Sequence, residues 1–288
     1  MLSFMESNKI KTFVWDVDNT LWDWISYAAR TYPAMSEIIA EEAGVERGLV
    51  EQCMQAYYTE AETMESSWLV QGLDKRGLFD GSDMDQGELI AKLQKSFHTN
   101  RERSLALYPG IEEVLEEATR RGIGHLILTD APAFHAASRL RHLDVDQSHF
   151  RAMIAMEDSL VHKIPKEHHH RFEDGRYGLE IPVYRVGVEK PHTDLETALQ
   201  MTREQIREQV CIIGDNGAKD MALAARYECV GLHAAWGRPQ QENLNTLSRF
   251  APTRVLRRSA ETGFNAHSSD RIAEIYSPDS ILQMMEWR

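Results

Sequence analysis

The chain has 288 residues, of which 42% are hydrophobic and 27% charged, as is typical of a globular protein with its own core. Its net charge of −13 argues against a broad attraction to nucleic acid or anionic lipid, so an anionic substrate needs locally placed cations or a metal ion. Residues 1–6 lack the basic start and apolar stretch of a secretory signal, and no apolar run reaches membrane-spanning length. We therefore expect a cytoplasmic protein with no nucleic-acid or membrane partner.

The first part of the chain changes from a strand pattern to a helical one. Residues 11–16 form a short apolar run, which predicts a buried parallel strand. Residues 22–105 have helical spacing, with a predicted break at Pro33. Residues 71–86 contain several glycines and aspartates, which predict a loop, and this loop is our candidate for a lid element.

From residue 106 onward, short apolar runs alternate with helical patterns. The expected strands cover residues 125–128, 152–155, 210–214 and 229–232, and the expected helices cover residues 111–121, 134–142, 193–201 and 220–227. Such alternation is typical of an α/β fold with a doubly wound, Rossmann-like parallel sheet. We therefore predict a core domain made of residues 1–21 and 106–288, with a helical cap domain at residues 22–105 inserted after the first strand.

Two carboxylates, those of Asp16 and Asp18, lie two residues apart at the end of the first expected strand. Alternate residues of an extended strand share one face, so these like charges repel each other. Stability alone does not explain such a pair, whereas a bound cation makes it favourable. Mg²⁺ is the simplest candidate, because it prefers a few carboxylates together with phosphate and water oxygens.

Polar residues also follow two other expected strands, with Thr129 after the second and Asp215 after the strand at 210–214. In doubly wound sheets, ligands bind outside the carboxyl ends of the strands. We therefore expect these residues to converge with Asp16. Lys190 precedes an expected helix and is a candidate to join them.

Four short motifs occur in order along the chain. They are DVDNT at residues 16–20, LILT at 126–129, Lys190-Pro191, and GDNGAKD at 214–220. The ordered set resembles the motifs of the haloacid dehalogenase (HAD) superfamily, in its phosphatase branch with a helical cap after the first motif. Each motif alone is a weak signal, whereas the set in this order is specific and spans nearly the whole chain.

The resemblance implies a role for each motif. Asp16 would attack phosphorus and form an aspartyl-phosphate, and Asp18 would protonate the leaving oxygen and later activate water. Thr129 would donate a hydrogen bond to a phosphate oxygen, and Lys190 would offset the charge of phosphate and Asp16. Thr20 would order the loop after the nucleophile.

The resemblance also implies a Mg²⁺ cofactor. The ion would be held by the carboxylates of Asp16 and Asp215 and by the backbone carbonyl of Asp18. Asp220 would lie close by or bind the ion through water. The positive charge would make an anionic nucleophile compatible with an anionic phosphate.

Several of these residues also fit simpler interpretations. Thr129 and Asp220 are plausible helix caps, and Lys190 is compatible with a solvated surface lysine. Trp22, close to the first motif, fits packing at the base of a cap better than stacking on a ligand. The long interval between Thr129 and Lys190 predicts an added hairpin at 160–186, where His168–His170 fit a solvated loop better than a metal site.

The sequence therefore predicts a Mg²⁺-dependent phosphatase acting on a phosphomonoester of a small metabolite. A cap that closes over the site would exclude water and favour small phosphorylated substrates. A phosphomutase would keep Asp16 and Asp18 and stays open as an alternative, as does a phosphate-binding module without turnover. A dehalogenase needs no acid at Asp18, which argues against that activity. The specific substrate and the oligomeric state stay open.

Overall fold

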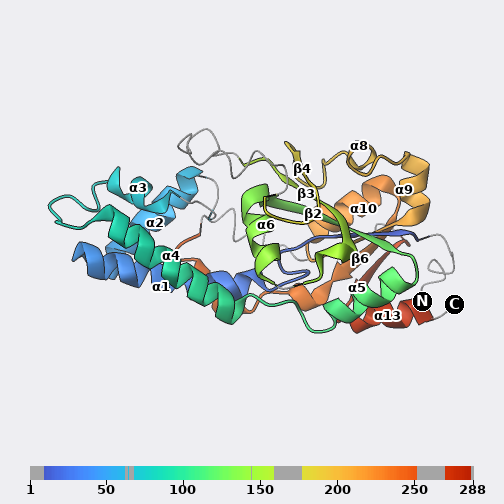
Figure 1. Ribbon diagram of the computed structural model, residues 1–288, viewed down its shortest axis with the longest axis horizontal. Helices are drawn as coiled ribbons and strands as arrows, with labels where there is room; N and C mark the ends of the chain where they lie inside the picture. Colours follow the sequence, from blue (N-terminus) through green and yellow to red (C-terminus); the bar gives the residue numbers. More distant parts are fainter. Residues whose placement is uncertain are drawn as a thin grey trace. The chain divides into compact units, whose positions relative to one another are not determined.

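The computed structural model describes residues 10–61, 64, 68–143, 145–158, 177–251 and 270–286 (Figure 1). The chain divides into an α/β unit, made of Met1–Asp23, Ala106–Arg238 and Glu261–Arg288, and a helical unit, made of Trp24–Leu105 and Pro239–Ala260. None of the helices in the described part of the chain combines the length and hydrophobicity needed to cross a lipid bilayer.

A seven-stranded sheet forms the centre of the α/β unit, in the order β4-β3-β2-β1-β5-β6-β7 among the described residues. The strands are β1 (Thr12–Trp15), β2 (Gly124–Pro132), β3 (Phe150–Met156), β4 (Val183–Val186), β5 (Val210–Gly214), β6 (Val230–Ala234) and β7 (Ile272–Ile275). Every neighbouring pair is parallel. The predicted α/β class with a parallel sheet and a helical insertion after β1 is therefore confirmed.

The central strands are the ones that the sequence predicts best. All residues of β1 and β5 are buried, which explains why each reads as a continuous apolar run. The two edges of the sheet are β4 and β7. Residues 183–186 were expected only as part of an added hairpin, and no strand was predicted at β7. Both strands are four residues long and partly exposed, so polar residues interrupt their apolar pattern.

Helices cover both faces of this sheet, as a doubly wound fold requires. They are α5 (Ile111–Arg120), α6 (Ala133–His142), α8 (Leu195–Leu199), α9 (Arg203–Gln209), α10 (Ala222–Tyr227) and α13 (Asp279–Glu286). In Figure 1, α5 and α13 lie side by side below the sheet, whereas α8, α9 and α10 lie above it.

The helical unit has a hydrophobic core of its own. Its helices are α1 (Trp24–Ala43), α2 (Arg47–Ala61), α3 (Leu69–Asp74), α4 (Gln86–Ser104) and α11 (Gln241–Leu247). The last of these helices comes from residues that were predicted to belong to the α/β core. It packs against α1, and Gln55 Nε2 nearby donates a hydrogen bond to the Ser248 carbonyl at 3.0 Å. An ion pair between Arg249 and Glu51 further joins this segment to α2.

The predicted helix break at Pro33 is wrong, because α1 continues through it. Proline removes one helical hydrogen bond and costs about 3 kcal/mol in a helix interior. Here the buried face of α1, including Tyr32 and Ile39, packs into the core of the helical unit and offsets that cost. The predicted loop at 71–86 is partly wrong as well, since its first residues belong to α3.

Candidate active site

The carboxylate of Asp16 lies at the carboxyl end of β1, in the middle of the sheet. Its backbone N–H donates a hydrogen bond to the Ile213 carbonyl at 2.9 Å, which ties it to β5. The Thr20 hydroxyl donates to Asp16 Oδ2 at 3.3 Å, and Lys190 Nζ donates to Oδ1 at 2.5 Å. Asp16 is 8% exposed, so the sheet and its loops hold this side chain in a largely dry position.

Lys190 is buried rather than solvated, being 4% exposed. Besides Asp16, its Nζ atom donates to Asp220 Oδ1 at 2.6 Å and to the Leu128 carbonyl at 3.3 Å. Burial disfavours the charged form, but the carboxylates of Asp16 and Asp220 outweigh it and raise the pKa of Lys190 well above its usual value. The lysine is therefore a permanent positive charge beside two of the acids.

Three buried carboxylates gather at this point, from Asp16, Asp215 and Asp220. One oxygen of each lies within 4.8 Å of the others. Burial, with Asp220 nearby, raises the pKa of Asp16 to about 6, although Lys190 opposes the shift. Burial and the two neighbouring acids raise the pKa of Asp215 well above its usual value. Three hard oxygen ligands and one lysine leave this cluster short of positive charge, so the donor set fits a metal ion.

Asp220 is not a helix cap, so that interpretation is wrong, because it lies inside the helical turn Gly217–Met221 that precedes α10. The cap of this turn is Asn216, whose side chain accepts hydrogen bonds from Ala218 N–H at 3.0 Å and Lys219 N–H at 3.1 Å. One Asp220 oxygen faces Lys190, and the other accepts from Asn216 N–H at 3.1 Å. A Cβ at Gly214 would overlap the Asp220 carboxylate, so glycine lets the acid approach the end of β5.

A second layer of residues supports Asp215 and the loop after Asp16. His233 on β6 contacts the Asp215 carbonyl through Nε2 at 2.8 Å. Trp236 Nε1 donates to the Thr20 carbonyl at 3.0 Å. A Cβ at the adjacent Gly237 would overlap the carbonyl oxygen of Asn19, so only glycine permits this approach.

The Asp18 carboxylate is not one of the three clustered acids. Its Oδ1 accepts from Trp22 Nε1 at 2.7 Å, and its Oδ2 accepts from Arg139 Nη2 at 3.0 Å. Trp22 is fully buried, as predicted for a packing residue, but its indole N–H also bonds Asp18. Arg139 lies in α6, and nothing local in the sequence linked it to the first motif.

The second motif is connected to Lys190 by Asp130, the residue that follows Thr129. The Thr129 hydroxyl is buried and accepts from Ala131 N–H at 3.1 Å, within the last part of β2. The next residue, Asp130, accepts from Lys190 N–H at 3.0 Å and from Lys219 Nζ at 2.5 Å. Asp130 was not among the predicted site residues, although its place directly after Thr129 is a usable signal in the sequence.

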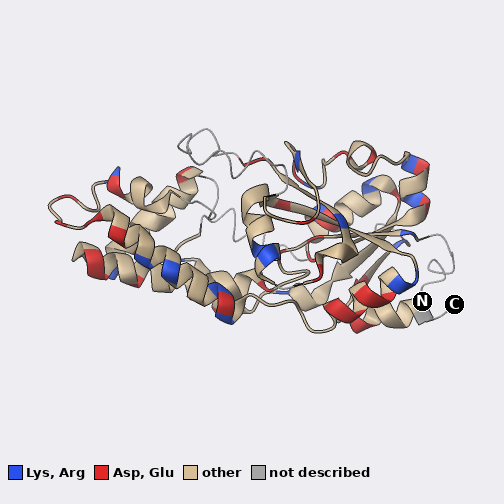
Figure 2. Ribbon diagram, viewed as in Figure 1, with Lys and Arg blue, Asp and Glu red and all other residues tan. Residues whose placement is uncertain are grey.

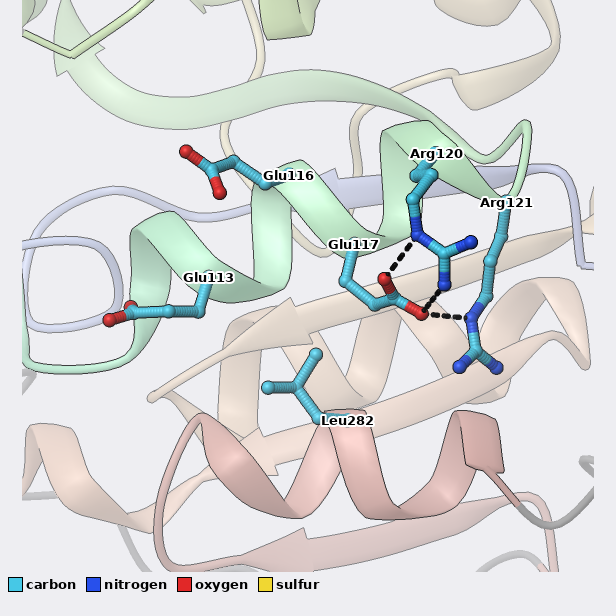
Figure 3. A pocket seen from close by; sticks show the side chains of 6 residues that line it. All are labelled: Glu113, Glu116, Glu117, Arg120, Arg121 and Leu282. Atoms are coloured by element: carbon cyan, nitrogen blue, oxygen red, sulfur yellow. Dashed lines mark hydrogen bonds and ion pairs between the residues drawn. The ribbon is translucent and has the colours of Figure 1, made fainter.

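Other candidate features lie apart from this cluster or outside the described residues. His168–His170 and most of the expected insertion at 160–186 fall outside the described residues, and β4 pairs with β3 in parallel. Figure 2 shows acidic residues along α5, with basic residues at its C-terminal end. A pocket of about 500 Å³ lies there between α5 and α13, and no residue of the four motifs lines it. Figure 3 shows ion pairs from Glu117 to Arg120 and Arg121 at this pocket.

Comparisons with known proteins agree with this arrangement. The model of the haloacid dehalogenase-like hydrolase family matches residues 10–227. Among solved structures, 2-haloacid dehalogenase from Pseudomonas syringae pv. Tomato DC3000 superposes with a TM-score of 0.54 at 15% identity, covering 97% of this chain and 100% of that one. HAD phosphatase from Thermococcus onnurineus gives a TM-score of 0.52 at 15% identity, covering 96% and 98%. These two likenesses show the fold alone, and comparison with curated proteins gives no match. This family match covers all four motifs and most of the chain. The chain therefore belongs to the haloacid dehalogenase-like hydrolases.

Proposed function

We propose that this protein is a Mg²⁺-dependent phosphatase that hydrolyses a phosphomonoester of a small metabolite. The observation that carries the proposal is the buried contact between Lys190 Nζ and Asp16 Oδ1, at 2.5 Å, beside Asp215 and Asp220. A lysine held between carboxylates offsets negative charge where an anionic substrate would meet an anionic nucleophile.

Asp16 is the proposed nucleophile. One of its oxygens is held by Lys190 and the other by Thr20, so the carboxylate is oriented before a substrate arrives. Attack on phosphorus would form an aspartyl-phosphate at Asp16 and release the alcohol part of the substrate. Thr129, on β2, is the proposed donor to a phosphate oxygen, because its hydroxyl accepts from Ala131 N–H and keeps its own proton for a further hydrogen bond.

Asp18 is the proposed acid and base. It would give a proton to the leaving oxygen in the first step and take one from water in the second. Its position two residues after Asp16 favours phosphoryl transfer over dehalogenation, because a halide leaves without a proton. A phosphomutase would use the same two carboxylates and is the second candidate.

The metal is proposed from the donor set. Asp16, Asp215 and the backbone carbonyl of Asp18 would hold Mg²⁺, with Asp220 beside them or bound through water. The ion would supply positive charge to the phosphate and to the clustered carboxylates.

A small substrate is proposed because of the helical unit inserted after β1. An inserted domain that closes over an active site excludes water and favours small molecules over folded proteins. The net charge of −13 supports a small phosphorylated partner rather than nucleic acid or a membrane.

The test is turnover of an aryl phosphate and of a panel of phosphorylated metabolites, with and without Mg²⁺. The matched control is Asp16→Asn, which is nearly isosteric. We expect Mg²⁺-dependent phosphate release by the wild type and a loss of several orders of magnitude in the variant. If the Asp16→Asn variant releases phosphate at a near-normal rate, the proposal is contradicted. Transfer of the phosphoryl group within a sugar phosphate, without release, identifies the phosphomutase.

A further inference from the structure

Both oxygens of the Asp18 carboxylate accept hydrogen bonds from large side chains. Trp22 Nε1 lies 2.7 Å from Oδ1, and Arg139 Nη2 lies 3.0 Å from Oδ2. The Arg139 guanidinium also lies over the Trp22 indole, 5.9 Å from the ring centroid. The three side chains therefore form one contiguous unit, although Arg139 follows Asp18 by 121 residues.

Arg139 and Trp22 form the buried part of this unit, and Asp18 is partly exposed. The Arg139 side chain is 6% exposed, and that of Asp18 is 25% exposed. A guanidinium this deeply buried needs carboxylate or other polar partners, and Asp18 supplies one of them. The helix that carries Arg139 is fixed at its start, because Phe134 N–H donates to Asp158 Oδ1 at 2.9 Å. The position of the guanidinium is thereby set by the fold.

We propose that Arg139 is a positioning residue that, together with Trp22, fixes the orientation of the Asp18 carboxylate for proton transfer. The inference rests on the proposed phosphatase function. A short carboxylate side chain can rotate, whereas proton transfer needs the acid about 2.6–3.2 Å from its partner atom. Two donors on two different oxygens define the plane of the carboxylate, and the charged donor makes the stronger bond.

The orientation has to serve two successive steps. In the first, the Asp18 O–H gives its proton to the leaving oxygen as the bond from phosphorus to that oxygen breaks and the bond to Asp16 forms. In the second, Asp18 takes a proton from water as the water oxygen bonds phosphorus and the Asp16–phosphorus bond breaks. Both protons move at the same carboxylate, so a loss of its orientation slows both steps.

The role predicts a particular kinetic signature for Arg139→Met. A poor leaving group, such as an alkyl phosphate, depends on the acid, whereas an activated aryl phosphate leaves nearly unaided. In single-turnover experiments with Mg²⁺, the variant should lose about tenfold or more rate on the alkyl substrate relative to the aryl substrate, the scale of one charge-assisted hydrogen bond. KM should change little, and Arg139→Lys should recover part of the loss.

Two controls separate this role from a structural one. Arg141→Met changes an exposed arginine on the same helix and should leave the rate ratio unchanged. In an Asp18→Asn background, Arg139→Met should not change the ratio further, because the group that it positions is already disabled.

Equal losses on the two substrates, or the same change of ratio in the Asp18→Asn background, overturn the inference. A rise in KM as the main effect also overturns it and makes Arg139 a substrate-binding residue. If Arg139→Met does not fold, Arg139→Lys and Trp22→Phe decide by the same ratio. If the wild type hydrolyses neither substrate, the proposed phosphatase function falls and this role with it, an outcome distinct from equal losses in an active enzyme.

Discussion

Lys190 Nζ bridges two carboxylates, lying 2.5 Å from Asp16 Oδ1 and 2.6 Å from Asp220 Oδ1. The lysine thus links the end of β1 to the segment after β5, and it does so with 4% of its surface exposed. Burial raises the pKa of Asp16 and that of Asp215, and the neighbouring acids, which one lysine does not balance, add to the rise.

The raised pKa of Asp16 predicts a pH dependence that responds to the metal. Burial and Asp220 raise this pKa from 3.8 to about 6, so in metal-free protein the carboxylate becomes protonated as the pH falls through that value. A cation nearby favours the ionised form and lowers the pKa. The acidic limb of kcat/KM should therefore move to lower pH as Mg²⁺ is raised. A limb that stays at the same pH at every Mg²⁺ concentration contradicts this electrostatic account.

The charge imbalance of the cluster also predicts that Mg²⁺ stabilises the fold. Binding to the native state alone raises the free energy of unfolding by about 2.7 kcal/mol at a hundredfold excess over Kd. The Tm should rise with Mg²⁺, and Asp215→Ala should weaken the response. The measurement is thermal unfolding after EDTA treatment, with Mg²⁺ titrated back. An unchanged Tm at all concentrations speaks against a metal at these acids.

The contacts of Asp130 predict a graded set of effects on Lys190. Asp130→Ala loses both the bond from Lys190 N–H and the ion pair with Lys219, whereas Asp130→Asn keeps an oxygen for the backbone bond. We expect a loss of about tenfold or more in kcat/KM for the alanine variant. Asp130→Asn removes only the ion pair with Lys219 and should show a smaller loss. Lys219→Met also removes the ion pair with Glu189, so its loss should be at least as large as that of Asp130→Asn. If all three variants match the wild type, Asp130 does not position Lys190.

The close approach of Gly237 to Asn19 predicts a large effect from one methyl group. Gly237→Ala would place a Cβ against a backbone carbonyl of the loop after Asp16, and backbone has little room to shift. We expect a loss of about 1–3 kcal/mol in the free energy of unfolding, together with lower activity. Gly187→Ala is the matched control, because a Cβ there meets nothing within 4 Å. Equal stability of the two variants by urea unfolding would show that the loop is free to move.

The parts of the fold and site that sequence could predict are those encoded locally. Asp16 and Asp215 end continuous apolar runs, and parallel strands bring such ends to one edge of a sheet. Arg139 and His233 reach the site from other elements, so their role depends on tertiary contacts that no local pattern encodes.

There are also physical reasons why the sequence did not predict some elements of the fold. Pro33 is a strong helix breaker locally, but packing of α1 outweighs its cost. The edge strands β4 and β7 are short and partly exposed, which weakens their hydrophobic pattern. The helix α11 is short and packs against α1, which is distant in sequence, so little in its own seven residues marks it as a helix.

The most direct test of the proposed function is detection of a phosphoryl group on Asp16. The Asp18→Asn variant, given an activated aryl phosphate and Mg²⁺, should accumulate this intermediate, because the base that activates water in the second step is missing. Acid quenching and mass spectrometry of the peptide containing Asp16 should show one added phosphoryl group, which Asp16→Asn abolishes. Phosphate release that continues with no phosphoryl group on Asp16, or with the group on another residue, contradicts the account.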